Sequence, residues 1–364
     1  MSSVLEVNLK SIKDNIKKYR LEIGDKKKFC AVVKADCYGL GAKQICKEID
    51  FLVDYFAVSS EREFLEIERV VTKPILILDP IYKNITKLAK RNCEFCVSNF
   101  AQFEKILKLS KRNKNTKYKI HIKVNTGMNR FGFSCVDEIV KIFNCLQKTQ
   151  NILIIGVFSH FYMGNNEDIA KFQLKKFEDI KFNLSQKFDV SKIIFHISNT
   201  DGFFIGKNLD MVRIGLGMFL KYNQNTFSLK SKIIEIQTLK KGETAGYSLG
   251  FIANKNTKVA VVSIGYGDGV SRKIAGQGFV LINGKFCKIL AVCMDSVIVD
   301  VSDASVCYQD DVVLIGKSKD KQIFVCDMAR WCDTIEYEIM TRISKRVKRD
   351  YVGGTSHANH NRKV

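Results

Sequence analysis

Runs of apolar residues rich in β-branched side chains alternate with amphipathic segments along much of the chain. Eight of these runs have the length and composition of buried strands. The predicted strands are Cys30 to Lys34, Phe56 to Ser60, Ile75 to Asp79, Glu94 to Asn99, Ile120 to Asn125, Ile154 to His160, Ile193 to Asn199 and Met211 to Gly215.

The segments between these runs carry apolar residues at steps of three and four, which is the spacing of an amphipathic helix. Predicted helices cover Gly41 to Ile49, Glu61 to Val70, Asn99 to Lys111, Val136 to Lys148 and Glu167 to Lys187. The last of these begins with acidic residues and ends with lysines, the order that the helix dipole favours. Repeated strand–helix units predict a parallel sheet, and eight strands predict closure into a (β/α)8 barrel of the TIM type, an α/β fold.

After Leu220 the pattern changes to shorter strands separated by glycine-rich turns. The predicted strands here are Val259 to Ile264, Phe279 to Ile282, Lys288 to Val292, Val297 to Val301, Val312 to Ile315 and Ile323 to Cys326, with helix near Met328 to Arg330 and at Tyr337 to Ser344. We therefore expect a barrel domain over residues 1–222 and a C-terminal, mainly-β domain over residues 223–364.

A barrel of this kind carries its chemistry at the C-terminal ends of its strands. The predicted ends are Lys34, Ser59, Asp79, Asn99, Lys123, His160, Asn199 and Arg213. Any strand needs a polar residue on its way to a loop, and this explanation is favoured for Ser59, Asp79 and Asn99. Lys34, Lys123, His160 and Arg213 instead end apolar runs with bulky or charged groups. A desolvated lysine at a barrel mouth can lose its proton, as Schiff-base chemistry requires.

The composition narrows the functional classes. A formal net charge of +21 would attract polyanions, but the basic stretches are short and match no nucleic-acid-reading motif, so we expect no nucleic-acid partner. No stretch has the length and apolarity of a membrane span, and the first ten residues lack a signal-peptide pattern. We therefore expect a cytoplasmic enzyme without a membrane partner.

The twelve cysteines fall at irregular spacings, several of them inside apolar runs, which indicates reduced core residues. Cys93 and Cys96 form a lone CxxC in a strand pattern, without a second pair. His357 and His360 lie near the C-terminus in a basic tail. Metal binding is disfavoured for both groups, and no metal cofactor is expected.

The segment Val33-Lys34-Ala35-Asp36-Cys37-Tyr38-Gly39-Leu40-Gly41-Ala42 resembles the pyridoxal 5'-phosphate (PLP) lysine motif of the alanine racemase family. Eight further segments match that family in the same order: His121 to Gly132, Phe158 to Phe161, Asn199-Thr200, Met211 to Gly215, Gly246 to Ser248, Gly265 to Gly269, Val292 to Asp295 and Ile335 to Glu338. The resemblance covers nearly the whole chain and implies a PLP-binding barrel followed by a β domain.

The resemblance implies a set of cofactor contacts. Lys34 would hold PLP as an aldimine, Arg213 would face the pyridine nitrogen and keep it unprotonated, and His160 would pack against the ring. The remaining cofactor residues implied by the resemblance are Tyr38, Asn199, Thr200, Gly215, Leu216 and Tyr337, most of them around the phosphate. Thr200 stands where serine is usual in the family, a change that keeps the hydroxyl.

Racemisation needs acid–base groups on opposite faces of the substrate. The resemblance implies that Lys34 serves one face and Tyr247 of a second subunit the other, in a homodimer whose active sites are shared. Tyr266 and Met294 of that second subunit would contact the substrate, and so would Arg130.

Lys123 matches a lysine that is carbamylated in many relatives, where the carbamate holds the matching arginine. Two positions depart from the family pattern: Asn125 replaces an aspartate and Leu40 replaces a histidine. Asn125 alters the local charge and makes carbamylation of Lys123 less secure.

The resemblance implies an alanine racemase, an isomerase that supplies D-alanine for peptidoglycan. The alternative is an amino-acid racemase of the same fold with broader specificity, acting on serine or lysine. A PLP decarboxylase is disfavoured by Arg213, and a non-catalytic PLP-binding regulator is disfavoured by the β domain and Tyr247.

Overall fold

The computed structural model describes residues 3–206, 208–247 and 250–354. These residues form two compact units. The barrel unit comprises residues 16–37 and 42–218, and the β unit comprises residues 1–15, 38–41 and 219–364 as far as they are described. Ser248, His357, His360 and the basic tail discussed above lie outside the described residues.

Eight parallel strands form the sheet of the barrel unit in the order β8-β7-β6-β5-β4-β3-β2-β9. They are β2 (Lys28–Val32), β3 (Tyr55–Val58), β4 (Ile75–Ile77), β5 (Cys93–Val97), β6 (Tyr118–Lys123), β7 (Ile152–Phe158), β8 (Ile194–His196) and β9 (Met211–Ile214). The sheet ends meet where the Asp210 N–H donates to the Phe195 carbonyl and the Arg213 N–H donates to the Ser198 carbonyl, both at 3.0 Å. The predicted eight-stranded barrel is confirmed.

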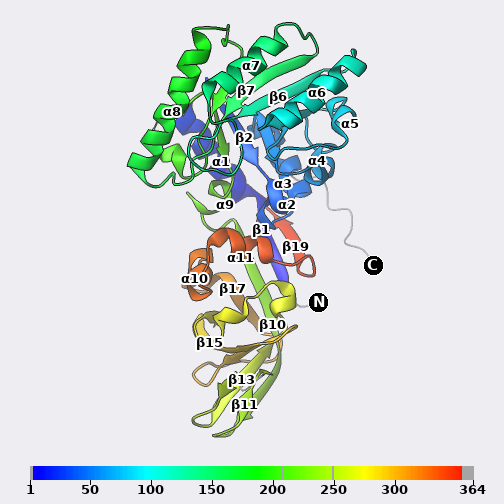
Figure 1. Cartoon of the computed structure of the whole chain (residues 1–364). Helices are drawn as coiled ribbons and strands as arrows, with labels where there is room; N and C mark the ends of the chain where they lie inside the picture. Colours follow the sequence, from blue (N-terminus) through cyan, green and yellow to red (C-terminus); the bar gives the residue numbers. More distant parts are fainter. Residues whose placement is uncertain (1–2, 207, 248–249, 355–364) are drawn as a thin grey trace. The chain divides into compact units, whose positions relative to one another are not determined.

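Helices cover the outer side of the barrel sheet, as α6, α7 and α8 do for β6 and β7 in Figure 1. The helices are α1 (Leu9–Ile23), α3 (Ala42–Ile49), α4 (Glu61–Ile67), α5 (Ile85–Ala89), α6 (Phe100–Arg112), α7 (Val136–Leu146), α8 (Glu167–Ser185) and α9 (Gly217–Leu220). The short segment α2 (Lys34–Tyr38) is a turn with left-handed backbone geometry and not a regular α-helix. The Asn99 side chain caps α6 by accepting from the Gln102 N–H, and Asn166 caps α8 by accepting from the Ile169 N–H. Sequence patterns did not predict α1 or α5.

The β unit contains a nine-stranded sheet in the order β18-β17-β14-β15-β16-β13-β10-β1-β19. Its strands are β1 (Val4–Asn8), β10 (Phe227–Leu239), β13 (Thr257–Val262), β14 (Phe279–Ile282), β15 (Lys285–Val292), β16 (Val297–Asp300), β17 (Asp311–Ser318), β18 (Lys321–Ile323) and β19 (Lys348–Val352). A short pair, β11 (Thr244–Ala245) and β12 (Phe251–Ile252), and the helices α10 (Val325–Trp331) and α11 (Glu336–Arg342) complete the unit. The mainly-β character is confirmed.

One predicted strand of the β unit is misplaced. The run Ile323 to Cys326 is not a single strand, because β18 ends at Ile323 and α10 begins at Val325. The Phe324 N–H donates to the Asp327 carboxylate at 2.9 Å, an interaction that starts a helix at this point.

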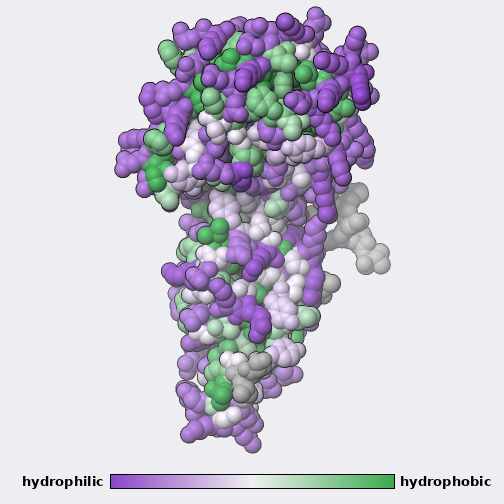
Figure 2. Space-filling model, in the orientation of Figure 1, coloured by the Kyte–Doolittle hydropathy of each residue, from purple (hydrophilic) through white to green (hydrophobic). Residues whose placement is uncertain are grey.

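The residues around the barrel strands form an apolar interior that includes thiols. One cluster comprises Cys30, Val32, Tyr55, Ala57, Leu76 and Met211. All twelve cysteines lie in the described part and are unpaired. Hydrophilic residues predominate on the face shown in Figure 2. Within the described ranges, no helix combines the length and the apolarity needed to cross a membrane.

Candidate active site

The barrel brings several of the predicted site residues together at one end of its strands. Lys34 follows β2 by two residues, Lys123 ends β6, and Arg213 lies in β9, paired in register with Cys30 of β2. The pKa of His160 is lowered well below 6.5 by burial, and then by the positive charges of Arg213, Lys123, Arg130 and Lys34. This set of charges surrounds a neutral imidazole just after β7.

The backbone after Lys34 makes an unusual turn. Ala35, Asp36 and Cys37 have φ between 52° and 55°, and Tyr38 has φ of 56°, so four consecutive non-glycine residues adopt left-handed backbone geometry. Such geometry costs roughly 1–2 kcal/mol per residue for an L-amino acid. Strain of this kind persists only where the surroundings enforce it, and it is concentrated at functional sites.

Three hydrogen bonds hold this turn in the barrel unit. The Ala35 N–H donates to Glu63 Oε1 at 2.9 Å, and the Ser59 N–H donates to Glu63 Oε2 at 2.7 Å. The Ala42 N–H donates to Asp36 Oδ1 at 2.8 Å at the start of α3. One glutamate of α4 therefore joins the ends of β2 and β3, and thereby supports the backbone next to Lys34.

The Arg213 guanidinium is buried and is held by the ends of β7 and β8. Its Nη1 donates to His196 Nδ1 at 2.7 Å, and its Nη2 donates to the Ser159 and Ile197 carbonyls at 2.7 and 3.1 Å. Nη2 also lies 3.3 Å from His160 Nδ1. Among the described residues, no carboxylate pairs with Arg213, and its Nε–H has no hydrogen-bond acceptor. Burial lowers the pKa of Arg213 to about 10.

A small polar cradle lies in the loops after β8 and β9. The N–H groups of Gly215 and Gly217 approach the Thr200 hydroxyl oxygen at 3.3 and 3.2 Å. A Cβ atom at Gly217 would lie 2.8 Å from Thr200 Cγ2 and would also meet the Tyr19 hydroxyl, so only glycine fits there. Leu216, between the two glycines, is half-buried. Asn199 donates to the Phe161 carbonyl at 3.1 Å and so ties the loop after β8 to the loop after β7.

Lys123 lies in an apolar pocket at the end of β6. Its Nζ is 4.4 Å from the centre of the Phe158 ring. Its pKa is lowered well below 10.5 by burial and then by the charges of Arg213 and Arg130. Arg130 is exposed, with its guanidinium carbon 4.9 Å from the centre of the Phe131 ring.

Asn125, which departs from the family pattern, organises the loop that carries Arg130. Its Oδ1 accepts from the N–H groups of Gly127 and Asn129, at 3.1 and 3.0 Å. Its Nδ2 donates to Asn129 Oδ1 and to Ser134 Oγ, at 3.0 and 3.2 Å. An aspartate could accept the two backbone donors and a hydrogen bond from the Ser134 hydroxyl, but its side chain could not donate to Asn129 Oδ1.

The other predicted site residues belong to the β unit. Tyr247, Tyr266 and Met294 are exposed, with fractional exposures of 70%, 39% and 50%. The Tyr266 N–H donates to the Cys293 carbonyl at 2.9 Å, and the Gly267 N–H donates to the Met294 carbonyl at 2.8 Å. These bonds hold Tyr266 and Met294 on neighbouring loops, with both side chains accessible.

Tyr38 and Tyr337 lie side by side in the β unit, with ring centres 5.9 Å apart. Gly39 is packed against the backbone of Met340 in α11, which leaves no room for a Cβ atom. Arg349 of β19 donates to the Gly39 carbonyl from Nε and Nη2, at 3.2 and 2.9 Å. The glycine that follows Tyr38 is thus clamped by both α11 and β19.

Three strand-end residues, Ser59, Asp79 and Asn99, were not predicted to take part in the chemistry. The Ser59 backbone binds Glu63, and Asn99 caps α6. Asp79 has no evident role. Within the described residues, no group of three or more His, Cys, Asp or Glu side chains is arranged to hold a metal ion.

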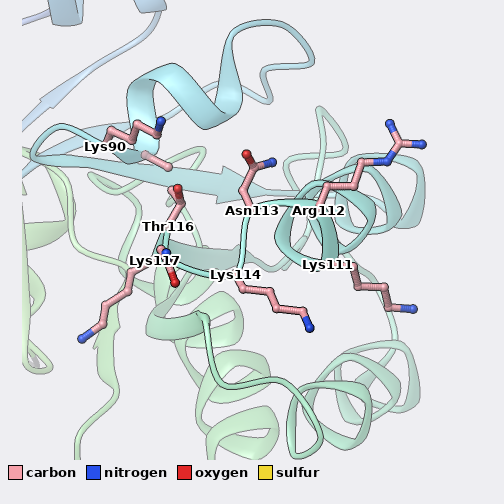
Figure 3. A pocket seen from close by; sticks show the side chains of 9 residues that line it. Lys90, Lys111, Arg112, Asn113, Lys114, Thr116 and Lys117 are labelled. Atoms are coloured by element: carbon pink, nitrogen blue, oxygen red, sulfur yellow. The ribbon is translucent and has the colours of Figure 1, made fainter.

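A basic hollow of about 890 Å³ lies at the opposite end of the barrel strands, next to the starts of β5 and β6. It is lined by Ala89, Lys90, Lys111, Arg112, Asn113, Lys114, Asn115, Thr116 and Lys117. In Figure 3 the Arg112 side chain points upward and the Lys117 side chain points to the lower left, whereas those of Lys111 and Lys114 both point to the lower right. They do not converge on a shared ligand position, and cations after the C-terminus of α6 are the arrangement that the helix dipole favours.

Sequence reasoning missed the residues behind Arg213. His196 lies in β8, His121 in β6 and Glu94 in β5, and all three side chains are buried. The available signal was a charged or polar residue inside each of three apolar runs. Glu63 was missed as well, because it occupies an ordinary position in the first turn of a helix.

The lowered pKa of His160 predicts how stability depends on pH. In the unfolded chain a histidine has a pKa of about 6.5, so below that pH the unfolded state binds a proton that the folded state does not. We expect the free energy of unfolding to fall between about pH 7 and pH 5, and to fall less in His160→Asn. Urea unfolding at a series of pH values measures both slopes. Equal slopes below pH 6.5, with parallel curves above it, would contradict the assignment.

Comparison with known proteins agrees with this architecture. The family model described as "Alanine racemase, N-terminal domain" matches residues 7–223, and "Alanine racemase, C-terminal domain" matches residues 226–351. The chain is 32% identical to "Alanine racemase 2" of Caldanaerobacter subterraneus subsp. tengcongensis, over 96% of this chain and 94% of that protein.

Solved structures resemble the chain over almost its full length. The alanine racemase of Bacillus anthracis with bound L-Ala-P has a TM-score of 0.88 and 27% identity, covering 96% of this chain and 95% of that one. The alanine racemase of Bartonella henselae with covalently bound pyridoxal phosphate has a TM-score of 0.86 and 25% identity, covering 97% of this chain and all of that one. Sequence, domain order and fold therefore agree, and the chain belongs to the alanine racemase family.

Proposed function

We propose that this protein interconverts L-alanine and D-alanine with PLP as its cofactor, acting as a homodimer. The observation that carries the proposal is the group at the C-terminal ends of the barrel strands: Lys34, a neutral His160, a buried Arg213 and the Thr200 cradle. The family's name supports alanine over the alternative substrates serine and lysine. Supply of D-alanine for peptidoglycan in the cytoplasm is part of the same proposal.

The residues present fit PLP. Lys34 offers a primary amine for the aldehyde carbon, and the Arg213 Nε–H is a donor without an acceptor among the described residues. The Thr200 hydroxyl and the N–H groups of Gly215 and Leu216 offer neutral donors for the phosphate, and we assign Tyr38, Asn199 and Tyr337 to the same cofactor. When bound, PLP supplies a conjugated ring that withdraws electrons from the substrate's α-carbon.

Arg213 sets the charge at the ring position. A guanidinium can donate hydrogen bonds but cannot accept one, so it leaves a pyridine nitrogen unprotonated. His160 beside it has a lowered pKa and stays neutral at neutral pH. With an unprotonated nitrogen, the ring withdraws electrons from the α-carbon less strongly, which limits side reactions such as transamination. This supports a racemase over a decarboxylase or a transaminase.

Two proton-transfer groups serve the two faces of the substrate. Lys34 accepts and returns the α-proton on one face, and Tyr247 of the partner subunit does so on the other. The exposure of Tyr247, Tyr266 and Met294 supports this proposal, because side chains that complete a neighbour's site must be accessible in the single chain. Tyr266 and Met294 would limit the side-chain pocket to the size of a methyl group.

Lys123 and Arg130 bind the anionic side of the substrate or cofactor in this proposal. The amine that reacts with CO2 is the neutral one, and burial favours that form of Lys123. A carbamate on Lys123 would add a negative charge near Arg213 and Arg130, and would hold Arg130 in position. Asn125 is neutral where the family usually has an aspartate, so position 125 adds no negative charge next to Lys123.

Lys34 is tested by trapping the cofactor. Borohydride reduction of the protein with PLP should leave the label on Lys34, and Lys34→Ala should abolish racemisation because both the anchor and one proton-transfer group are lost. Lys28→Ala, at the exposed start of the same strand, is the matched control and should keep its activity. Peptide mapping and a coupled D-alanine assay measure the two effects. A label on a different lysine would refute the cofactor assignment.

Tyr247 is tested by separating the two faces. Tyr247→Phe should bind PLP yet lose racemisation by about 10² to 10⁴-fold, because each direction needs both groups. Exchange of the α-proton with deuterium should persist for D-alanine, through Lys34, and be lost for L-alanine. Tyr308→Phe, an exposed tyrosine of the same unit, is the control. Equal exchange into both enantiomers, measured by NMR, would be incompatible with two bases.

Lys123 is tested by labelling with CO2. Protein equilibrated with ¹³C-bicarbonate should show a carbamate carbon resonance that disappears in Lys123→Met and remains in Lys117→Met, where the replaced lysine lines the basic hollow. Retention of the resonance in Lys123→Met would assign the carbamate elsewhere. A spectrum without any such resonance would mean that Arg130 is held by the Asn125 loop alone.

A further inference from the structure

Four buried side chains form a continuous hydrogen-bonded chain through the interior of the barrel. Glu94 Oε2 lies 2.7 Å from His121 Nε2, His121 Nδ1 lies 3.0 Å from His196 Nε2, and His196 Nδ1 lies 2.7 Å from Arg213 Nη1. These side chains come from β5, β6, β8 and β9, and their exposures are 2%, 0%, 0% and 3%. The mechanism proposed above uses only the last of them.

The two ends of the chain fix the position of every proton between them. Arg213 can only donate, so His196 Nδ1 must accept and its proton must be on Nε2. That proton points at His121 Nδ1, which must then accept, and so the proton of His121 is on Nε2. Glu94 Oε2 accepts from this N–H, which completes the chain. Every N–H in it points from Arg213 toward Glu94.

Packing around these four hydrogen-bonded side chains leaves them little freedom to rearrange. The His196 ring stacks on Phe158, with centres 5.0 Å apart and planes inclined by 5°. The His121 ring packs edge-on against Tyr55, and a Cβ atom at Gly156 would collide with it. Lys119 Nζ lies 4.0 Å from Glu94 Oε1 and gives the carboxylate a second partner. The carboxylate is thus held at one end while Arg213 is held at the other.

A chain of this kind is costly to bury unless it is complete. An imidazole N–H without an acceptor inside a protein carries a desolvation penalty, and an isolated buried guanidinium carries a larger one. Glu94 removes the first penalty by accepting from His121, and His196 with the Ser159 and Ile197 carbonyls lowers the second by accepting from Arg213. Without Glu94, nothing would favour the proton on His121 Nε2, and the other tautomer offers His196 no acceptor at Nδ1.

We propose that Glu94 is a positioning residue for the racemase, which orients the Arg213 guanidinium toward the cofactor through His121 and His196. This inference rests on the proposed function, since it assigns Arg213 to the pyridine nitrogen. Glu94 does not touch substrate or cofactor. It acts by fixing the tautomers and ring orientations of two histidines, and the terminal acceptor is the property that matters.

The test compares variants of the holoenzyme that keep or remove this acceptor. Glu94→Gln retains an oxygen that can accept from His121, whereas Glu94→Leu retains none. We expect Glu94→Leu to lower kcat by about tenfold or more with KM for alanine within about twofold, as misorientation of a catalytic group does. Glu94→Gln should recover most of that loss. Cys96→Ala, at a buried position two residues further along β5, is the matched control and should retain wild-type kcat.

Spectroscopy supplies a readout that a loss of stability would not produce. In ¹⁵N-histidine-labelled holoenzyme, the His196 Nδ1 resonance reports the hydrogen bond from Arg213, and it should shift in Glu94→Leu but not in Glu94→Gln or Cys96→Ala. The PLP absorption band should change in the same variant only. An unshifted resonance and full activity in Glu94→Leu would overturn the proposal.

A second variant keeps the proposal testable if Glu94→Leu does not fold. His121→Phe keeps a ring of similar shape but breaks the chain at the next link, so it should reproduce both the kcat loss and the resonance shift. Wild-type kcat and an unshifted His196 Nδ1 resonance in His121→Phe would overturn the proposal. Failure of the proposed function would instead appear as wild-type protein that neither binds PLP nor racemises alanine.

Discussion

A guanidinium group buried at the end of β9 constrains the rest of the barrel interior. Arg213 has no carboxylate beside it among the described residues, so its N–H groups must be satisfied by neutral acceptors. The ends of β7 and β8 supply these acceptors as the Ser159 and Ile197 carbonyls and the His196 imidazole. The buried guanidinium keeps these hydrogen bonds only if the strand ends move little, so the backbone around Arg213 is held in place.

The backbone after Lys34 differs from the surroundings of Arg213, because its conformation is energetically unfavourable. Four successive residues in left-handed geometry are unfavourable in themselves, and the turn exists because Glu63, Asp36 and buried packing at Cys37 enforce it. The strained turn therefore fixes the backbone that immediately follows Lys34. The acceptors around Arg213 and the turn after Lys34 are the two most constrained parts of the proposed site.

The sequence allowed the barrel strands and their polar ends to be predicted, because buried parallel strands are apolar throughout and their exits are not. Strand β10 was missed because Ser231 occupies one of the buried positions of its alternation and the alternation stops after Ile233, although β10 pairs with strands on both of its sides. Lys34 and Arg213 were predicted as site residues from local motifs, and both lie at the ends of barrel strands. The partner of Glu94 is 27 residues away, and no local pattern indicates that the two side chains meet. Long-range pairing of this kind depends on strand register, which the sequence pattern does not reveal.

The burial of most of the cysteines determines which thiols of the folded protein can be chemically labelled. Cys30 and Cys96 lie inside the barrel, where burial raises the pKa of each to about 12, and burial also raises the pKa values of Cys37 and Cys93 well above the ordinary value. Thiols that stay protonated react slowly with alkylating agents and peroxides, because the thiolate is the nucleophile. Exposed Cys135, Cys307 and Cys326 are therefore the positions that a fluorophore or spin label reaches first in the folded protein.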